Sequence, residues 1–408
     1  MNTKELFSNL RTSYEREEFD NFLKKIKFSY TIPSVHITGT NGKGSTASYL
    51  ANILTMAGYK VGLFNSPYFM SPCEMIKINN RDISEEQFLS IYNEYKKDIQ
   101  KADLSEFEIE TLIAFTYFQR EKCDIAVIEC GMGGELDATN IFTPVLSIIT
   151  SVSLEHTAFL GRSLSEIAIQ KAGIIKEEVP VLLYQNVNED VLKVFSETAK
   201  SNNTKLYQVE MYHFEHLEDD GYHFMYSGIN ELVIPTKSLY SITDACLAME
   251  ALKFISESFP VNEKAVRDGL KMTRLPGRMS EVNHNPLVIV DGAHNPEAIS
   301  TLVKDIGKLK INGEIHVVFA SFTDKNITNE LPDLGLISND LTLTHFNHPR
   351  CREEEDYFLY LEDYKYNADH QTVIQQLMKD YPDDTILVTG SLAFAMLVYD
   401  EFLKGIYK

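Results

Sequence analysis

A glycine-rich segment at residues 37–46, ITGTNGKGST, contains the residue types that bind phosphate groups. The usual phosphate loop reads Gly, any four residues, Gly, Lys, then Ser or Thr. Gly42 and Lys43 fit this pattern, but Ile37 stands where the first glycine is expected and Gly44 separates the lysine from the hydroxyl residue. Glycines allow close approach of backbone N–H groups, the lysine adds positive charge, and a hydroxyl can reach magnesium. The segment predicts a nucleotide site, and the alternative is a turn that only joins a strand to a helix.

The elements around this loop support the phosphate interpretation. Residues 34–38 are expected to form a strand and residues 44–58 the helix after it, so the N–H groups at the helix start would face the anion. The predicted nucleotide-binding residues of the loop are Gly39, Thr40, Asn41, Gly42, Lys43, Gly44, Ser45 and Thr46.

Two further side chains that could hold a metal ion follow predicted strands. Glu129 lies near the end of the strand 124–130 and precedes a run of glycines, and His156 follows the strand 145–152. Ligands of open α/β sheets bind at the carboxyl ends of the strands, and carboxylates bind magnesium. The alternatives are an exposed loop acid for Glu129 and a structural role for the single histidine.

Apolar strands alternate with segments of helical period, which is typical of parallel α/β sheets. In the first half the further expected strands are 60–64 and 179–184, and the expected helices are 85–99, 108–122 and 243–258. The stretch 203–236 alternates over short distances and predicts a small antiparallel addition of β-hairpins.

A second, smaller α/β series begins after a segment with Pro276 and Gly277. Its expected strands are 286–292, 314–320, 341–346 and 385–390, with helices at 296–307 and 391–403. We therefore predict a P-loop ATPase-type parallel-sheet domain with a small antiparallel addition, and a smaller Rossmann-like α/β domain. The expected divisions are residues 1–274, a linker at 275–282, and residues 283–408.

Composition narrows the function classes. The 408 residues include 59 acids and 38 bases, a net charge of −21, which argues against a nucleic acid or an anionic membrane surface as partner. No apolar run reaches the roughly 18 residues of a membrane helix. The five cysteines are scattered, so neither a disulfide framework nor a zinc site is indicated. A soluble cytoplasmic enzyme is the expectation.

The irregular spacing of the glycine-rich loop resembles that of the Mur ligase superfamily, and GTNGKGS resembles its folylpolyglutamate synthase and dihydrofolate synthase branch. Further matching stretches follow in order. They are NSPYFMSPCEMIKIN (65–79), IECGMGGELDATN (128–140), LEHTAFLG (154–161), QKAGIIK (170–176), LPGRMSEV (275–282) and VDGAHNPEA (290–298). The resemblance extends from about residue 10 to residue 400.

The resemblance implies ATP and Mg²⁺ as cofactors and assigns roles to individual residues. Ser66, Glu129 and His156 would hold magnesium, and Lys171 would be a carbamylated lysine. The other possibility for Lys171 is an ion pair with an acid such as Glu166.

In the second domain the resemblance implies that Arg278 and Asp291 contact ATP and that His294 faces the reacting groups. Asp291 stands at a predicted strand end, and a bidentate arginine suits phosphate. Without the resemblance, Arg278 would be read as a solvated charge of the linker. In the first domain, Asp244 would lie near the nucleotide.

Several positions depart from the family pattern. In the Ser-Pro loop these are Tyr68, Phe69, Glu74 and Met75. Glu135 stands where a base is usual, Asp244 replaces an asparagine, and Tyr240 and Ser241 stand where His-Gln is frequent. Leu136, Asp137 and Ala138 retain a stretch that resembles the dihydropteroate-contacting part of dual-function members. The departures concern the pterin and adenine pockets and leave the phosphate and metal residues in place.

The implied activity is ATP-dependent addition of L-glutamate to the γ-carboxylate of a reduced folate by a monomer. Lys43, Lys171 and His294 are the predicted catalytic residues. Dihydrofolate synthase, which places glutamate on dihydropteroate, or an enzyme with both activities is the alternative within the family. Outside it stand a nucleotide-binding protein without turnover and a P-loop kinase; the inserted Gly44 and the second α/β domain argue against the kinase.

Overall fold

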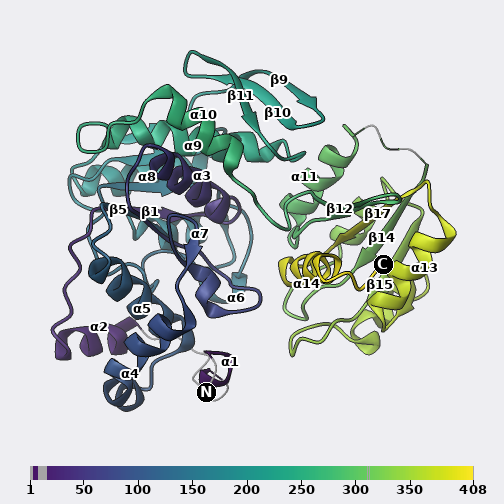
Figure 1. Cartoon of the computed structure of the whole chain (residues 1–408), viewed down its shortest axis with the longest axis horizontal. Coiled ribbons are helices and arrows are strands. Elements are labelled where there is room, and N and C mark those ends of the chain that lie inside the picture. Colours follow the sequence, from purple (N-terminus) through teal and green to yellow (C-terminus); the bar gives the residue numbers. More distant parts are fainter. Residues whose placement is uncertain (1–2, 8–15, 310, 312, 408) are drawn as a thin grey trace. The chain divides into compact units, whose positions relative to one another are not determined.

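Two compact units make up the chain in the computed structural model, which describes residues 3–7, 16–309, 311 and 313–407 (Figure 1). The first unit gathers Met1–His216, His223–Pro235 and Ser241–Thr273. The second gathers Leu217–Tyr222, Thr236–Tyr240 and Arg274–Lys408. Each unit contains its own mainly parallel sheet with helices, so the predicted fold class is confirmed.

The main sheet of the first unit has eight strands in the order β4-β3-β2-β5-β1-β6-β7-β8. Six neighbouring strands pair in parallel, namely β2, β5, β1, β6, β7 and β8. The strands β3 and β4 add an antiparallel edge next to β2. The strands are β1 (Ser34–Thr38), β2 (Val61–Phe64), β3 (Ile76–Ile78), β4 (Arg81–Asp82), β5 (Ile125–Glu129), β6 (Leu146–Ile149), β7 (Val181–Leu183) and β8 (Leu206–Gln208).

Helices connect these strands and cover the sheet, so its central strands are buried along their whole length. Every residue of β1, β2, β5 and β6 is buried. The helices of this part are α1 (Thr3–Leu6), α2 (Arg16–Lys25), α3 (Lys43–Met56), α4 (Glu85–Ala102), α5 (Glu106–Arg120), α6 (Thr157–Leu160), α7 (Leu164–Ala172), α8 (Glu189–Ser201), α9 (Tyr240–Ile255) and α10 (Glu263–Met272), with the 3₁₀ turn η1 (Pro72–Met75).

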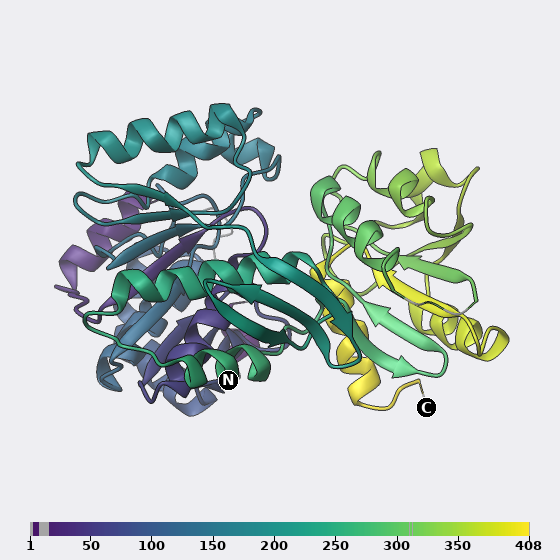
Figure 2. The ribbon, with the colours of Figure 1, turned by 90° about the horizontal axis from the view of Figure 1, so that it is seen from above.

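The antiparallel addition is a separate sheet in the order β11-β10-β9, visible in teal and green in Figure 2. Its strands are β9 (His213–Glu218), β10 (Gly221–Tyr226) and β11 (Ile229–Ile234). The prediction for 203–236 was wrong at its start, because β8 pairs in parallel with β7 and ends the main sheet. The helix expected at 243–258 is followed by a further helix, α10.

The second unit has a six-stranded sheet in the order β12-β13-β17-β14-β15-β16, in which only β12 is antiparallel. Its strands are β12 (Ser280–His284), β13 (Leu287–Val290), β14 (Ile315–Phe319), β15 (Asp340–Thr344), β16 (Lys365–Asn367) and β17 (Thr385–Thr389). Its helices are α11 (Pro296–Ile306), α12 (Glu330–Leu334), α13 (His370–Asp380) and α14 (Leu392–Leu403), with η2 (Glu354–Tyr360).

Residues of β13, β14 and β17 alternate between two apolar clusters on opposite faces of this sheet. Ile289, Val317 and Leu387 belong to one cluster, and Val288, Val318 and Val388 to the other. The segment expected to be a linker, 275–282, is clustered with the second unit, and its last three residues are the start of β12. Within the described ranges no helix is both long and apolar enough to cross a bilayer.

Candidate active site

The glycine-rich loop lies between the buried strand β1 and the helix α3, where the sequence predicts it. Gly42 is the N-cap of α3 and adopts a left-handed backbone (φ 82°), which glycine tolerates. The Lys43 ammonium folds over the loop and donates to the carbonyls of Gly39 and Thr40 at 3.1 and 3.2 Å. The lysine charge is thus held at the loop, at the helix end where an anion is stabilised.

The hydroxyl of Thr46 tests whether the loop fits a ligand. Thr46 is fully buried in the first turn of α3, and its Oγ1 has no hydrogen-bond partner within the described part of the chain. A buried hydroxyl without a partner costs about 1–3 kcal/mol, so native proteins rarely leave one unsatisfied. A phosphate group or its metal ion at the loop would supply the missing partner.

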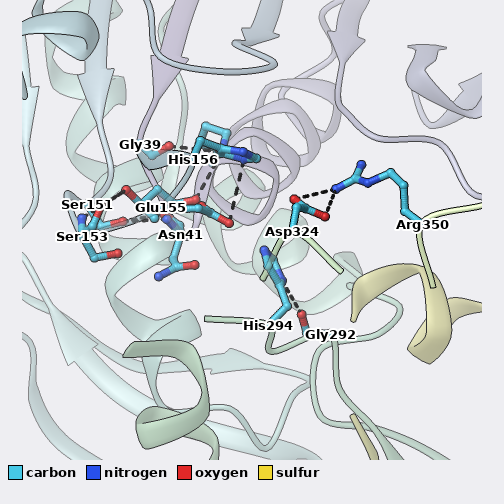
Figure 3. A network of polar contacts seen from close by, with 12 residues as sticks. Gly39, Asn41, Ser151, Ser153, Glu155, His156, Gly292, His294, Asp324 and Arg350 are labelled. Carbon is cyan, nitrogen blue, oxygen red and sulfur yellow. Dashed lines mark hydrogen bonds and ion pairs between the residues drawn. The ribbon is translucent and has the colours of Figure 1, made fainter. Parts of the chain in front are cut away.

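The segment after β6 holds the glycine-rich loop in shape. Ser151 accepts hydrogen bonds from the loop through its carbonyl (Thr40 N–H, 3.0 Å) and its hydroxyl (Asn41 N–H, 2.7 Å). The Thr150 hydroxyl donates to the Asn41 carbonyl at 2.6 Å. Figure 3 shows Ser151 and Ser153 beside Asn41. The sequence analysis therefore missed Thr150 and Ser151, whose hydroxyls contact the phosphate loop.

Asp244 of α9 lies directly against the loop. A Cβ placed on Gly42 would lie 2.3 Å from Asp244 Oδ1, so only glycine fits there. Asp244 itself is buried, with an exposed fraction of 5%. The structure thus places the predicted nucleotide residue Asp244 at the phosphate loop.

Glu129 ends β5 beside the end of β1, since Ile37 and Glu129 are register partners in the parallel pair. The carboxylate is buried, with 3% exposure, and its Oε2 accepts the Ser66 N–H at 3.2 Å. A Cβ on Gly44 would lie 3.2 Å from the same oxygen. Two of the three predicted metal ligands, Glu129 and Ser66, therefore lie together at the phosphate loop, and their oxygen donors suit magnesium.

His156 follows β6, the other neighbour of β1, and caps the short helix α6 with a left-handed backbone (φ 49°). Its Nε2 lies 3.9 Å from Oε1 of Glu155, and Figure 3 shows the two side chains together. The Glu155 side chain is largely buried, with 8% exposure. Sequence analysis singled out His156 and missed Glu155, although both stand in the LEH stretch that follows a strand.

Lys171 is buried near the end of α7, with 2% exposure. Burial, together with the charge of Lys43, lowers its pKa to about 7, and the Glu155 carboxylate opposes the shift. The carboxylate of Glu166 instead accepts N–H bonds from Arg162 and Ser163 at the start of α7. The alternative role for Lys171, an ion pair with Glu166, is not found among the contacts of the described residues.

The loop at the end of β5, within the stretch 128–140 and here called the acidic glycine loop, is organised by Asp137. Its buried carboxylate accepts the Met132 N–H at 2.8 Å, the Thr139 N–H at 3.0 Å and the Thr139 hydroxyl at 2.6 Å. Burial raises the pKa of Asp137. Ala138 is also buried, whereas the Leu136 side chain is 55% exposed. Of the three predicted substrate residues, only Leu136 presents its side chain to solvent.

In the second unit, Asp291 comes immediately after β13 and its carboxylate binds backbone groups. It accepts the Met279 N–H at 2.8 Å and the Ala293 N–H at 2.9 Å. Burial raises its pKa, and the charge of Arg278 opposes that shift. Asp291 thus holds the segment that carries the half-buried Arg278 in place beside the end of β13.

His294 lies in the loop between β13 and α11. Its Nδ1 donates to the Gly292 carbonyl at 2.8 Å, so Nε2 carries the remaining lone pair in the neutral ring (Figure 3). A further polar pair of this unit escaped the sequence analysis: both carboxylate oxygens of Asp324 lie 2.9 Å from one Arg350 nitrogen. The two residues are 26 positions apart in the sequence, so no local pattern predicted that they pair.

Two known protein families match most of the chain. Residues 37–238 match the Mur ligase middle domain, and residues 277–392 match the Mur ligase glutamate ligase domain. These two segments contain the phosphate loop and the His294 loop.

Individual relatives match over most of the chain. It is 32% identical to the dihydrofolate synthase/folylpolyglutamate synthase of Bacillus subtilis, covering 89% of each chain. It is 30% identical to the folylpolyglutamate synthase of Lacticaseibacillus casei, covering 91% of this chain and 90% of the relative. A solved folylpolyglutamate synthase complex with AMPPCP and folate superposes with a TM-score of 0.87 at 28% identity, over 99% of this chain and all of that one.

Proposed function

The chain belongs to the Mur ligase family, in its dihydrofolate synthase/folylpolyglutamate synthase branch, and we propose on this basis that it is an ATP-dependent ligase that adds L-glutamate to folate. The reaction is extension at the γ-carboxylate of a reduced folate. The observation that carries the proposal is the convergence of the phosphate loop, Glu129 and Ser66 at adjacent strand ends.

The chemistry needs a leaving group on the folate carboxylate. Attack of a carboxylate oxygen on the γ-phosphorus of ATP forms an acyl phosphate and releases ADP. The amine of glutamate then attacks the acyl carbon, the C–O bond to phosphate breaks, and the amide, inorganic phosphate and a proton are the products. The loop N–H groups and Lys43 stabilise the charge on the transferring phosphoryl group.

Magnesium fits the residues around the loop. Ser66, Glu129 and His156 are the proposed ligands, and the buried carboxylate and the half-buried Ser66 hydroxyl are donors that this ion accepts. Bound magnesium neutralises phosphate charge. Ser45 follows Gly44 at the start of α3 and is the further proposed contact to the nucleotide phosphates.

Carbamylation of Lys171 is also proposed, because carbon dioxide reacts with a neutral amine. A pKa of about 7 leaves a large fraction of this amine neutral at physiological pH, whereas an ordinary lysine is almost fully charged. The N–C bond that forms converts the side chain to a carbamate anion and releases a proton. Lys43 is the cation whose charge that anion would offset.

In the second unit, Arg278 and Asp291 are the proposed nucleotide-binding residues and His294 the proposed catalytic residue. Support comes from the Asp291 contacts that hold this segment and from the His294 Nδ1 hydrogen bond to the Gly292 carbonyl, which fixes the orientation of the ring. A monomer in the cytoplasm completes the proposal. The five cysteines are all free and buried, as is usual for proteins of a reducing compartment.

Dihydrofolate synthase activity is the second candidate, favoured by the double name of the Bacillus subtilis relative. The acidic glycine loop that carries Leu136, Asp137 and Ala138 is the proposed substrate contact in either case. Three hydrogen bonds to the Asp137 carboxylate fix this loop, so that the exposed Leu136 side chain is held in one position for a substrate to contact.

The proposal is tested by ADP release from purified protein with Mg-ATP. ADP release should require both glutamate and a folate substrate, and Lys43→Ala or Glu129→Gln should remove it while circular dichroism remains unchanged. Wild-type rates in either variant would overturn the site assignment, and ADP release without glutamate would overturn the ligase reaction.

A further inference from the structure

The three-stranded sheet carries a cluster of metal-ligating side chains, none of which belongs to the proposed magnesium site. One ligand atom from each of His216, Glu218 and His223 lies within 4.8 Å of the others. His216 and Glu218 stand two residues apart on β9, and His223 stands on the neighbouring strand β10 (Figure 1). We call these three residues the histidine cluster.

The cluster occupies the face of the sheet that does not form the core. Along β10, Tyr222, Phe224 and Tyr226 are buried, while His223 between them is only half-buried. Side chains alternate between the faces of a strand, so His223 points away from the buried tyrosines and phenylalanine. His216 and Glu218 are exposed, and an ion in solution can reach the cluster.

The two imidazole rings lie nearly parallel on adjacent strands, with centroids 5.2 Å apart and an interplanar angle of 26°. Each ring turns its Nδ1 toward an oxygen. His216 Nδ1 donates to the Phe214 carbonyl at 3.4 Å, and His223 Nδ1 lies 3.7 Å from Oε2 of Glu231 on β11. Metal-bound histidines commonly donate a hydrogen bond through one ring nitrogen and coordinate through the other, and the His216 Nδ1 contact follows the first part of this pattern.

We propose that the histidine cluster binds one divalent transition-metal ion, with zinc as the best fit. Two imidazoles and a carboxylate are a zinc ligand set, whereas magnesium and calcium prefer oxygen ligands throughout. Three protein ligands leave a position for water. With the ion bound, Glu231, whose Oε2 lies 3.7 Å from His223 Nδ1, would be the positioning residue for that ring.

The ion would link β9 to β10 and so stabilise the hairpin, because an ion that binds only the folded state raises stability by mass action. Small three-stranded sheets bury little apolar surface on their own. This inference does not depend on the ligase activity.

The experiment uses the full chain carrying Glu129→Gln, which removes the carboxylate of the proposed magnesium site and so limits binding there. Metal-free protein is titrated with zinc by calorimetry, and with cobalt by visible absorption. The expected result is one zinc ion per chain. His216→Ala and His223→Ala should each abolish the binding, and Glu231→Gln should weaken it about 10-fold.

His213→Ala is the matched control, because His213 is another exposed histidine on β9 that lies outside the cluster. Zinc should bind this variant as it binds the parent, and should raise the melting temperature of both but not of His216→Ala. The proposal is overturned if the parent binds no zinc, if zinc binds His216→Ala or His223→Ala as tightly as the parent, or if His213→Ala loses binding. Glu218→Gln gives a second check with a side chain of the same size: unchanged affinity there would remove Glu218 from the site.

Discussion

Gly44 packs against the carboxylate of Glu129, with its missing Cβ position only 3.2 Å from Oε2 of that residue. The inserted glycine that breaks the usual phosphate-loop spacing is thus the residue that lets α3 begin beside the proposed metal ligand. Gly44→Ala should move the carboxylate by a few tenths of an ångström.

The expected result for Gly44→Ala is a rise of about 10-fold in the KM for Mg-ATP, because metal and phosphate geometry tolerate little displacement. Stability should stay constant or rise, since alanine favours a helix over glycine by about 1 kcal/mol. Steady-state kinetics and urea unfolding separate the two effects. Gly307→Ala at the end of α11 is the control, because its Cβ would meet nothing closer than 3.4 Å. Unchanged kinetics in Gly44→Ala would contradict the proposed contact.

Lys171 should make the stability of the protein depend on pH. Its folded-state pKa of about 7 lies below the ordinary lysine value, so between these pH values the unfolded chain binds more protons than the folded chain. The free energy of unfolding should therefore rise with pH above about 7, with a contribution of at most ~1.4 kcal/mol per pH unit. Below pH 7 lysine is charged in both states and the contribution is constant.

Urea unfolding at several pH values in bicarbonate-free buffer measures this slope. Lys171→Met should remove this slope. The comparison is Lys176→Met, because Lys176 is less deeply buried than Lys171 and its pKa is also lowered by burial. With bicarbonate present, intact-protein mass spectrometry without acid should show a carbon dioxide adduct that Lys171→Met lacks. An adduct of equal abundance in Lys171→Met would assign it to another amine.

Leu136 and Asp137 are neighbours with opposite expected effects. Leu136 is exposed, so Leu136→Ala should leave stability unchanged and raise the KM for the pterin substrate about fivefold, or ~1 kcal/mol of apolar contact. Asp137→Ala leaves the Met132 and Thr139 donors unsatisfied and should destabilise the fold by about 2–3 kcal/mol. Kinetics and thermal unfolding test the pair, with the exposed Leu336→Ala as control. An effect of Leu136→Ala on the ATP KM alone would argue against its substrate role.

His316 is predicted to hold the second unit together through two carboxylates. Its Nδ1 and Nε2 lie 2.7 Å from Asp340 and 3.1 Å from Asp384. The hydrogen bond from His316 lowers the pKa of Asp384. For Asp340, burial raises the pKa, but hydrogen bonds from Lys365 and His316 outweigh it and the net shift is downward.

Depressed carboxylate pKa values stabilise the folded state above the unfolded-state pKa of about 3.9, and this contribution is lost as the pH falls through the lower folded-state values. His316→Ala should lower the free energy of unfolding at pH 7 by about 2 kcal/mol or more and flatten its acid dependence. Chemical denaturation between neutral and acidic pH measures both, with the exposed His284→Ala as control. Equal stability of the two variants would contradict this role.

Local signals explain which parts of the fold the sequence predicted. The strand β1 and the start of α3 were expected at their observed places because an apolar run ends at glycines that interrupt both periods. β8 was assigned to the antiparallel addition, since a three-residue strand with mostly exposed side chains resembles the hairpins that follow it. Its parallel partner β7 lies more than twenty residues earlier, and local pattern does not identify such a pairing.

In the candidate site, too, local sequence predicted some residues, while contacts between distant segments were not predicted. Residue types indicated Lys43, Glu129 and His156, because each stands at or after the carboxyl end of a buried strand. The contacts of Ser151 and Thr150 with the phosphate loop join segments 110 and 109 residues apart. The sequence also did not predict that the Asp137 carboxylate is buried, because the same loop sequence is compatible with a side chain that faces the interior or the solvent.

The most direct test of the proposed function is mass spectrometry of reactions with Mg-ATP and glutamate, with tetrahydrofolate in one tube and dihydropteroate in another. Glu129→Gln serves as the control for enzyme-dependent product. The account predicts one or more added glutamates on tetrahydrofolate, and addition to dihydropteroate as well would make the enzyme bifunctional. Absence of glutamate addition in the tetrahydrofolate tube, with protein that is folded and binds ATP, would contradict the account.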